Sequence, residues 1–305
     1  MRIALIVNTS SADAVEVLRA SVQKLREAGS QVQPRLTFEG GDARAFAREA
    51  AAAGVDLVVA GGGDGTVNEV VNGIYDWLEE RAEPASAPVP RLGIIPMGTA
   101  NDLAGGLGIP GGDPETAFAI AVAGIPYAVD VGRVNGRCFL NVSTGGFGAE
   151  ATDGASKGLK HKLGPLAYLV TGVQKFVNLE TAEARFTSGG EVMFDGEFMI
   201  FAVGNFRRTG GGNFVTAKAD LDDRLLDLCV VEGMSHVDFL KIAPQLRAGR
   251  HVDHERVTYR KVRELVVESP RELTVNADGE PLAARRFEYS IAPYRLTLVV
   301  PKLPE

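Results

Sequence analysis

The stretch from Asp56 to Val71, DLVVAGGGDGTVNEVV, limits the possible folds more than any other part of the chain. An apolar run from Leu57 to Ala60 ends in three glycines, an Asp-Gly pair and Thr66, and a helix-like pattern begins at Val67. A strand, a glycine loop and a helix in this order direct backbone N–H groups and a helix N-terminus at a phosphate. We interpret the stretch as a nucleotide site. A plain glycine-rich turn between a strand and a helix is the structural alternative.

The loop differs from two common phosphate-binding loops. Its glycine spacing is not that of G-x-G-x-x-G, and no Lys-Ser/Thr pair closes it as in a P-loop. Asp64 places a carboxylate in the loop, which would repel a bare phosphate but suits a phosphate that carries Mg²⁺. The sequence therefore favours a magnesium–nucleotide complex as the ligand.

Alternating strand and helix patterns before residue 128 predict a doubly wound, mostly parallel α/β nucleotide-binding domain. From about Tyr127 strand-like runs dominate, which predicts a β-rich, sandwich-like domain over 129–305 with a cleft between the two domains. The last strand, about 292–305, is a candidate to return to the first domain. The predicted strands of the second half include Ala128–Val134, Arg137–Val142 and Arg256–Glu268, and the predicted helices are Pro165–Val177 and His236–Leu246.

Two further stretches carry groups suited to phosphoryl transfer. Pro96–Asp102, PMGTAND, repeats the arrangement of a strand that ends in Gly-Thr and opens a helix, so Thr99 is a second nucleotide candidate or a helix cap. Thr274–Pro281, TVNADGEP, contains an Asp-Gly pair that also signals a hairpin turn. In the functional interpretation Asp278 is a general base, and Glu280 positions it or stands in for it.

Two other stretches allow both a functional and a purely structural interpretation. The acidic loop Ala219–Asp227 can hold a hard cation with the help of backbone carbonyls, or it is a solvated turn. Ser156–Val177 mixes lysines with leucines, which suits either a helix at an anionic membrane surface or a packed helix with solvated lysines.

Composition narrows the class of protein. A net charge of −7 argues against a broad nucleic-acid surface. Cys138 and Cys229 lie in apolar runs without a CxxC or His partner, which predicts buried, reduced thiols. We find no secretory signal and no apolar run long enough to span a bilayer. We expect a cytoplasmic protein, whose contact with lipid is peripheral, at the inner face of the membrane.

Four segments in order, GGGDGTVNEV, PMGTANDLA, NVSTGGFGAE and NADGEPL, resemble the diacylglycerol-kinase-type catalytic family. The chain is most similar to the bacterial YegS-type lipid kinases, along nearly its whole length. GGDGT alone also occurs in NAD kinases and, in a related form, in phosphofructokinases. The resemblance implies an ATP-dependent, Mg²⁺-requiring kinase of phospholipid metabolism, whose acceptor is a membrane lipid such as phosphatidylglycerol or diacylglycerol.

The resemblance also implies roles for single residues. Asp278 of the DGE segment matches the proton acceptor. A structural Mg²⁺ would be held by Asp220, Asp223 and Leu225, the outer two through backbone carbonyls, although Arg224 stands where the family commonly has Gly. The implied nucleotide contacts are Thr37, Gly62, Gly63, Asp64, Gly65, Thr66, Val67, Asn68 and Thr99.

Two other functions remain as alternatives. An NAD kinase shares the GGDGT loop and would phosphorylate a soluble substrate, but the GTAND and DGEP segments speak against it. A regulatory module would bind ATP without transferring phosphate, and the intact Asp278-Gly279-Glu280 disfavours it.

Overall fold

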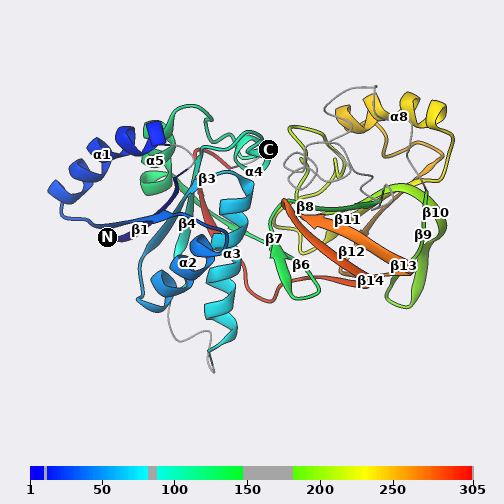
Figure 1. Ribbon diagram of the computed structural model, residues 1–305, viewed down its shortest axis with the longest axis horizontal. Coiled ribbons are helices and arrows are strands. Elements are labelled where there is room, and N and C mark those ends of the chain that lie inside the picture. Colours follow the sequence, from blue (N-terminus) through cyan, green and yellow to red (C-terminus); the bar gives the residue numbers. More distant parts are fainter. Residues whose placement is uncertain (10–11, 82–87, 147–180, 304–305) are drawn as a thin grey trace. The chain divides into compact units, whose positions relative to one another are not determined.

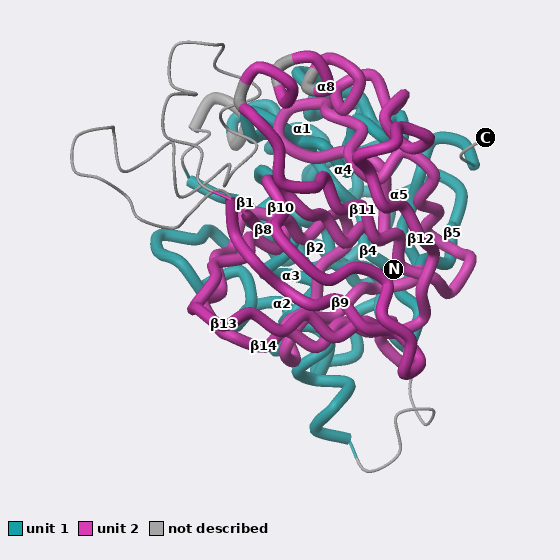
Figure 2. Tube along the Cα trace, turned by 90° about the vertical axis from the view of Figure 1, so that its right-hand side faces the viewer, with its two compact units in different colours: residues 1–129, 294–305 teal, residues 130–293 magenta. Residues whose placement is uncertain are grey.

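The fold is that of a computed structural model, which describes residues 1–9, 12–81, 88–146 and 181–303. The chain forms two compact units. One consists of residues 1–129 and 294–305, and the other of residues 130–293 (Figure 2).

The first unit is a six-stranded sheet between two layers of helices (Figure 1). The strand order is β2-β1-β3-β4-β15-β5, and only β5 runs antiparallel to its neighbour. Helices α2 and α3 pack together on one face, and α1 and α5 pack on the other. The strands are β1 (Arg2–Asn8), β2 (Gln31–Thr37), β3 (Leu57–Gly62), β4 (Arg91–Pro96), β5 (Ile125–Val129) and β15 (Leu296–Val300), and the helices are α1 (Ala12–Glu27), α2 (Asp42–Ala52), α3 (Asp64–Glu79), α4 (Asp102–Gly106) and α5 (Pro114–Ala123).

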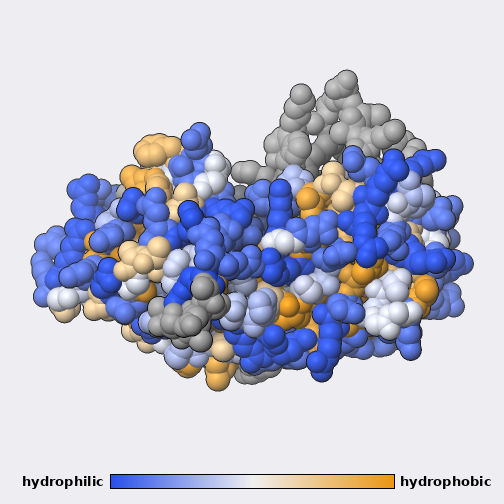
Figure 3. Space-filling model, turned by 90° about the horizontal axis from the view of Figure 1, so that it is seen from below, coloured by the Kyte–Doolittle hydropathy of each residue, from blue (hydrophilic) through white to orange (hydrophobic). Residues whose placement is uncertain are grey.

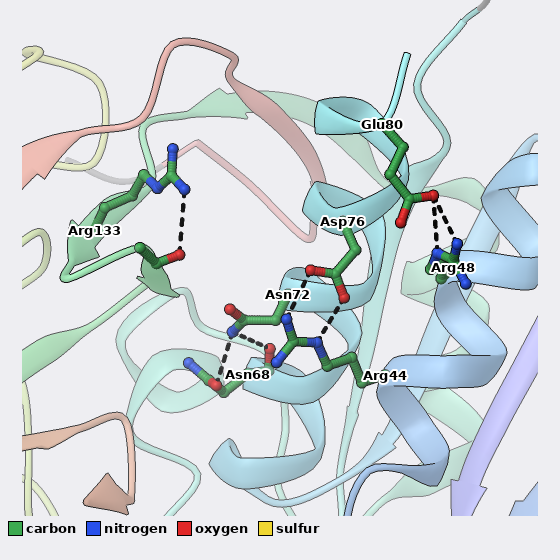
Figure 4. Close-up of polar contacts among 8 residues, drawn as sticks. Arg44, Arg48, Asn68, Asn72, Asp76, Glu80 and Arg133 are labelled. Carbon is green, nitrogen blue, oxygen red and sulfur yellow. Dashed lines mark hydrogen bonds and ion pairs between the residues drawn. The ribbon is translucent and has the colours of Figure 1, made fainter. Parts of the chain in front are cut away.

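Close packing of α2 against α3 explains one glycine outside the loops. A Cβ at Gly73 would collide with the backbone carbonyl of Arg44, so only glycine permits this approach. Arg44 pairs with Asp76 at 2.6 Å and Arg48 pairs with Glu80 at 2.7 Å across the same helices (Figure 4). These pairs are partly exposed, so they contribute little to stability and mainly fix the register of the two helices.

The second unit is an antiparallel sheet whose strands lie in the order β12-β11-β10-β8-β13-β14-β6-β7, with β9 paired to both β10 and β13. Because β9 joins two strands of the same sheet, the sheet folds over a buried aromatic core that includes Phe186, Phe198 and Phe201. Helix α8 (His236–Ala248) covers a second apolar cluster through Phe239 and Ile242. The strands are β6 (Gly132–Val134), β7 (Arg137–Phe139), β8 (Val142–Gly146), β9 (Ala182–Ser188), β10 (Glu191–Gly204), β11 (Leu226–Glu232), β12 (Val257–Val262), β13 (Glu264–Ala277) and β14 (Glu280–Ile291).

The predicted fold class is confirmed, but three predicted strands are wrong in extent. Arg137–Val142 is not one strand, because β7 ends at Phe139 and β8 begins at Val142. Ala128–Val134 is not one strand, because the chain leaves the first sheet after Val129 and β6 belongs to the second. The buried Asp130 lies at the break, and its N–H donates to the carbonyl of Leu221. Arg256–Glu268 is likewise two strands, β12 and β13.

Among the described residues, no helix is both long and apolar enough to cross a bilayer. On the face shown in Figure 3, hydrophobic residues form separate patches within a largely hydrophilic surface. The predicted helix Pro165–Val177, and with it the lysine-rich stretch Ser156–Val177, lies outside the described residues.

Candidate functional site

The first glycine loop follows β3 at the carboxyl edge of the parallel sheet, where doubly wound folds bind ligands. Gly63 is the N-cap of α3, and no side chain caps the helix. The first N–H groups of α3 are therefore available to an anion, and the helix dipole favours one there. A Cβ at Gly65 would meet no described atom within 4 Å, so the first turn of α3 faces open space.

The second glycine loop follows β4 and lies directly against the first. Met97 N–H donates to the carbonyl of Gly62 at 2.9 Å. A Cβ at Gly98 would lie 2.5 Å from Cα of Gly63, so the two loops touch backbone to backbone. Asn101 closes the second loop by accepting from Gly98 N–H at 2.9 Å and donating to Gly98 O at 2.7 Å. Thr99 is exposed within this turn, so its hydroxyl is accessible to a ligand.

Asp64 links the two loops through its carboxylate. It accepts the N–H of Asp102 at 3.2 Å and that of Leu103 at 3.4 Å, at the start of α4. Burial, and then the negative charge of Asp102, raises the pKa of Asp64 above its usual value. A cation beside this pair would relieve both effects. Because Mg²⁺ in nucleotide sites commonly uses one or two carboxylates together with phosphate oxygens, this part of the predicted site fits Mg²⁺ carried by a nucleotide.

Thr66 and Thr37 lie on the same edge of the sheet, joined through Asn8. The hydroxyl of Thr66 lies over Gly62, where a Cβ would come within 2.4 Å of it, and Asn8 Nδ2 approaches that hydroxyl at 3.4 Å. Asn8 is also the strand partner of Thr37, which is buried. Asn8 was not singled out from the sequence, because its contact with Thr66 spans 58 residues.

Two predicted nucleotide residues serve the helix itself. Val67 is buried, and its N–H donates to Gly63 O at 3.1 Å, so it has no polar group to offer a ligand except its carbonyl. Asn68 is buried and accepts from the side chain of Asn72, one turn later in α3, at 3.0 Å (Figure 4). Both residues thus make contacts within α3, and their nucleotide role stays a prediction.

Asp278 and Gly279 form the two-residue turn between β13 and β14. Their φ values of 48° and 101° are both positive, as a type I′ hairpin turn requires. The carboxylate of Asp278 accepts backbone N–H groups from Leu140 at 2.6 Å, Val142 at 3.0 Å and Asn141 at 3.1 Å. These charge-assisted bonds anchor the turn, so the carboxylate of Asp278 has a structural role in the hairpin.

Glu280 differs from Asp278 in its surroundings. It is exposed at the first position of β14, and its side chain makes no hydrogen bond or ion pair with another described residue. Of the two alternatives open from the sequence, this geometry favours Glu280 as the group that accepts a proton and Asp278 as the group that holds the turn.

The acidic loop before β11 does not fit the structural Mg²⁺ that the resemblance implies. Lys261 Nζ lies 2.5 Å from Asp223 Oδ2, and Leu225 N–H donates to Asp223 Oδ1 at 3.0 Å. Asp223 is the one predicted side-chain ligand, and both of its carboxylate oxygens therefore already have partners within the protein. Within the described residues, no group of three or more His, Cys, Asp and Glu side chains is arranged to hold a metal ion.

Comparison with known families covers both units. A sequence model of the diacylglycerol kinase catalytic domain matches residues 2–134. A model of the YegS C-terminal NAD kinase beta sandwich-like domain matches residues 141–300.

Relatives of similar length match along nearly the whole chain. A Pseudomonas aeruginosa protein named "Probable lipid kinase YegS-like" is 39% identical over 287 residues, which cover 94% of this chain and 90% of that protein. A Stenotrophomonas maltophilia protein of the same name is 39% identical over 303 residues, which cover 97% and 95%.

Solved structures agree with the sequence comparison. The crystal structure of "a putative diacylglycerol kinase from Bacillus anthracis str. Sterne" matches with a TM-score of 0.81 and 29% identity, and covers 98% of this chain and 95% of that one. Yeast NADH kinase complexed with NADH matches with a TM-score of 0.53 and 11% identity, covering 98% and 83%, which shows a likeness of fold alone.

Proposed function

The chain belongs to the YegS-like lipid kinases with a diacylglycerol kinase catalytic domain, and from this premise we propose that it transfers the γ-phosphoryl group of ATP to a hydroxyl of a membrane lipid, phosphatidylglycerol or diacylglycerol. The observation that carries the choice of ATP site is the contact of the two glycine loops at Gly63 and Gly98, beside the uncapped start of α3. Binding to lipid is peripheral in this proposal.

The first unit binds and orients the triphosphate. Backbone N–H groups of Asp64, Gly65 and Thr66 donate to phosphate oxygens, and the helix dipole of α3 stabilises their negative charge. Thr99 adds a hydroxyl from the second loop. Mg²⁺ carried by the nucleotide, beside Asp64, would offset charge on the phosphates when bound.

The second unit supplies the proton acceptor. The lipid oxygen forms a bond to the γ-phosphorus while the bond from that phosphorus to the bridging oxygen breaks, and ADP leaves. The hydroxyl proton passes to the carboxylate of Glu280. Asp278 keeps Glu280 in place, because its three amide contacts fix the turn that begins β14. In this proposal the lipid hydroxyl lies beside the carboxylate of Glu280 when the proton is transferred.

A panel of acceptors tests the proposed function. The full chain is incubated with radiolabelled ATP and Mg²⁺, and with mixed micelles of phosphatidylglycerol, diacylglycerol or neither. NAD is offered in a parallel reaction. The proposal predicts label in one of the lipids. Label in NAD would favour the soluble-substrate kinase, and ATP binding with no labelled acceptor would favour the regulatory module.

A further inference from the structure

A lysine side chain of the protein supplies the positive charge that lies beside the acidic loop of the second unit. The loop leads into β11, and β11 pairs with β12 in a register that places Asp227 opposite Lys261. Lys261 Nζ lies 2.5 Å from Asp223 Oδ2 and 3.5 Å from Asp227 Oδ2. The ammonium therefore lies between the loop carboxylate and a strand carboxylate that is fully buried.

The remaining carboxylate oxygens also have partners in the chain. Asp223 Oδ1 accepts from Leu225 N–H at 3.0 Å, and Asp227 Oδ1 accepts from the hydroxyl of Tyr259 at 2.8 Å. Lys261 and Tyr259 both belong to β12, so this one strand brings a cation and a hydroxyl to the two aspartates. Asp227 Oδ2 is buried and accepts no hydrogen bond from a described residue, so the Lys261 ammonium at 3.5 Å is the positive charge that faces it. A metal ion at Asp223 would have to displace the ammonium or share its position, against their mutual repulsion.

Arg224 gives a second cation to the same loop. Its φ of 60° lies in the left-handed region, and its backbone N–H donates to Asp130 Oδ2 at 2.6 Å. Its guanidinium approaches Asp130 Oδ1 at 3.3 Å. Asp130 is fully buried, so this contact offsets the cost of burying its charge. The residue that departs from the family's usual glycine thus adds a positive charge to the loop.

We infer that the Lys261 ammonium takes the position of the structural Mg²⁺ in this chain, and that the second unit is stable without a divalent cation. The ammonium carries one charge and donates directly to carboxylate oxygens, whereas Mg²⁺ demands six oxygen ligands in near-octahedral geometry. Cross-strand pairing with Asp227 fixes where Lys261 stands, so the position is built into the sheet.

Thermal unfolding without nucleotide tests this inference through stability rather than activity. The Asp64→Asn variant is melted in excess EDTA and in excess MgCl₂, because this substitution removes the carboxylate of the first glycine loop as a magnesium ligand. We expect the same Tm in both solutions. A Tm several degrees higher in MgCl₂ would overturn the inference.

Substitution of the lysine provides the second arm. Lys261→Met removes the charge at similar side-chain length, and we expect Tm to fall by at least about 4 °C because two aspartates lose their cation. Lys261→Arg should recover most of the loss. Lys241→Met is the matched control, since Lys241 pairs with Asp238 at 2.7 Å on the exposed surface of α8. Equal Tm values for Lys261→Met and the control would contradict the inference, and failure of Lys261→Met to fold while Lys261→Arg folds would support it.

Discussion

Gly98 and Gly63 touch backbone to backbone, and a Cβ at Gly98 would lie 2.5 Å from Cα of Gly63. This contact places the turn after β4 against the start of α3, so one edge of the sheet presents two loops to a single ligand. Position 98 requires a glycine because a side chain would not fit between the two backbones. A left-handed φ is not the reason, since Gly98 is not among the positive-φ glycines.

Gly98→Ala should separate the two loops. We expect a loss of about 1–3 kcal/mol of unfolding free energy from the forced backbone shift, and a higher Kd for ATP. Thermal melts and ATP titrations measure the two effects. Gly111→Ala is the control, because a Cβ there meets nothing within 4 Å and its φ is not positive. Equal effects of the two substitutions would argue against a functional contact between the loops.

Gly65→Ala separates ligand binding from stability. A Cβ at Gly65 meets no described atom within 4 Å, and alanine is a better helix residue than glycine by about 0.5–1 kcal/mol, so Tm should stay the same or rise. If the phosphates lie at this turn of α3, the added methyl group raises the Kd for ATP. An unchanged Kd would show that the triphosphate does not lie there.

Asp278→Asn should weaken the hairpin between β13 and β14. The amide side chain has one acceptor oxygen for the N–H groups of Leu140, Asn141 and Val142, and its own NH₂ group faces donors. We expect a loss of about 1–3 kcal/mol in denaturant unfolding. Glu280→Gln changes an exposed side chain and should unfold like the wild type. Wild-type stability of Asp278→Asn would refute the anchoring role.

His251 should make the protein less stable in mild acid. It is buried, and Nε2 lies 2.8 Å from Val215 O while Nδ1 lies 3.4 Å from Gln245 O. Burial lowers its pKa against the opposing effect of these carbonyls, so the unfolded chain binds the proton more readily. The stability from neutral His251 is present above about pH 6.5 and is lost as pH falls toward the folded pKa.

The difference between the wild type and His251→Asn isolates that effect. Unfolding free energies of both proteins are measured from neutral pH to pH 5, and the wild type should lose more stability than the variant, by at most about 1.4 kcal/mol per pH unit. Parallel curves would show that His251 does not titrate differently in the folded and unfolded chains.

The sequence predicted the fold class because its strongest signals are local. Apolar periodicity and glycine position specified β3, the following loop and α3 within a few residues. Strand ends were less predictable. Nothing local in Ala128–Val134 shows that Asp130 turns away to bond Leu221, since that contact joins residues 91 positions apart.

The roles of the two acidic residues in the DGE segment also depended on distant contacts. The sequence identified Asp278 as a candidate general base and its Asp-Gly pair as a hairpin turn, and the structure confirms the turn. Only the structure shows that the carboxylate of Asp278 accepts the backbone N–H groups of residues 140–142. In the same way, Lys261 lies 38 residues from Asp223, too far for spacing to reveal the pair.

The most direct test compares wild type and Glu280→Gln in transfer of the γ-phosphoryl group from labelled ATP to lipid in mixed micelles. Loss of a general base commonly costs about 10²–10⁴-fold in rate. We predict labelled lipid with the wild type, a fall of that order with Glu280→Gln, and the same Kd for ATP in both. Wild-type turnover by Glu280→Gln, or label in NAD in place of lipid, would contradict the account.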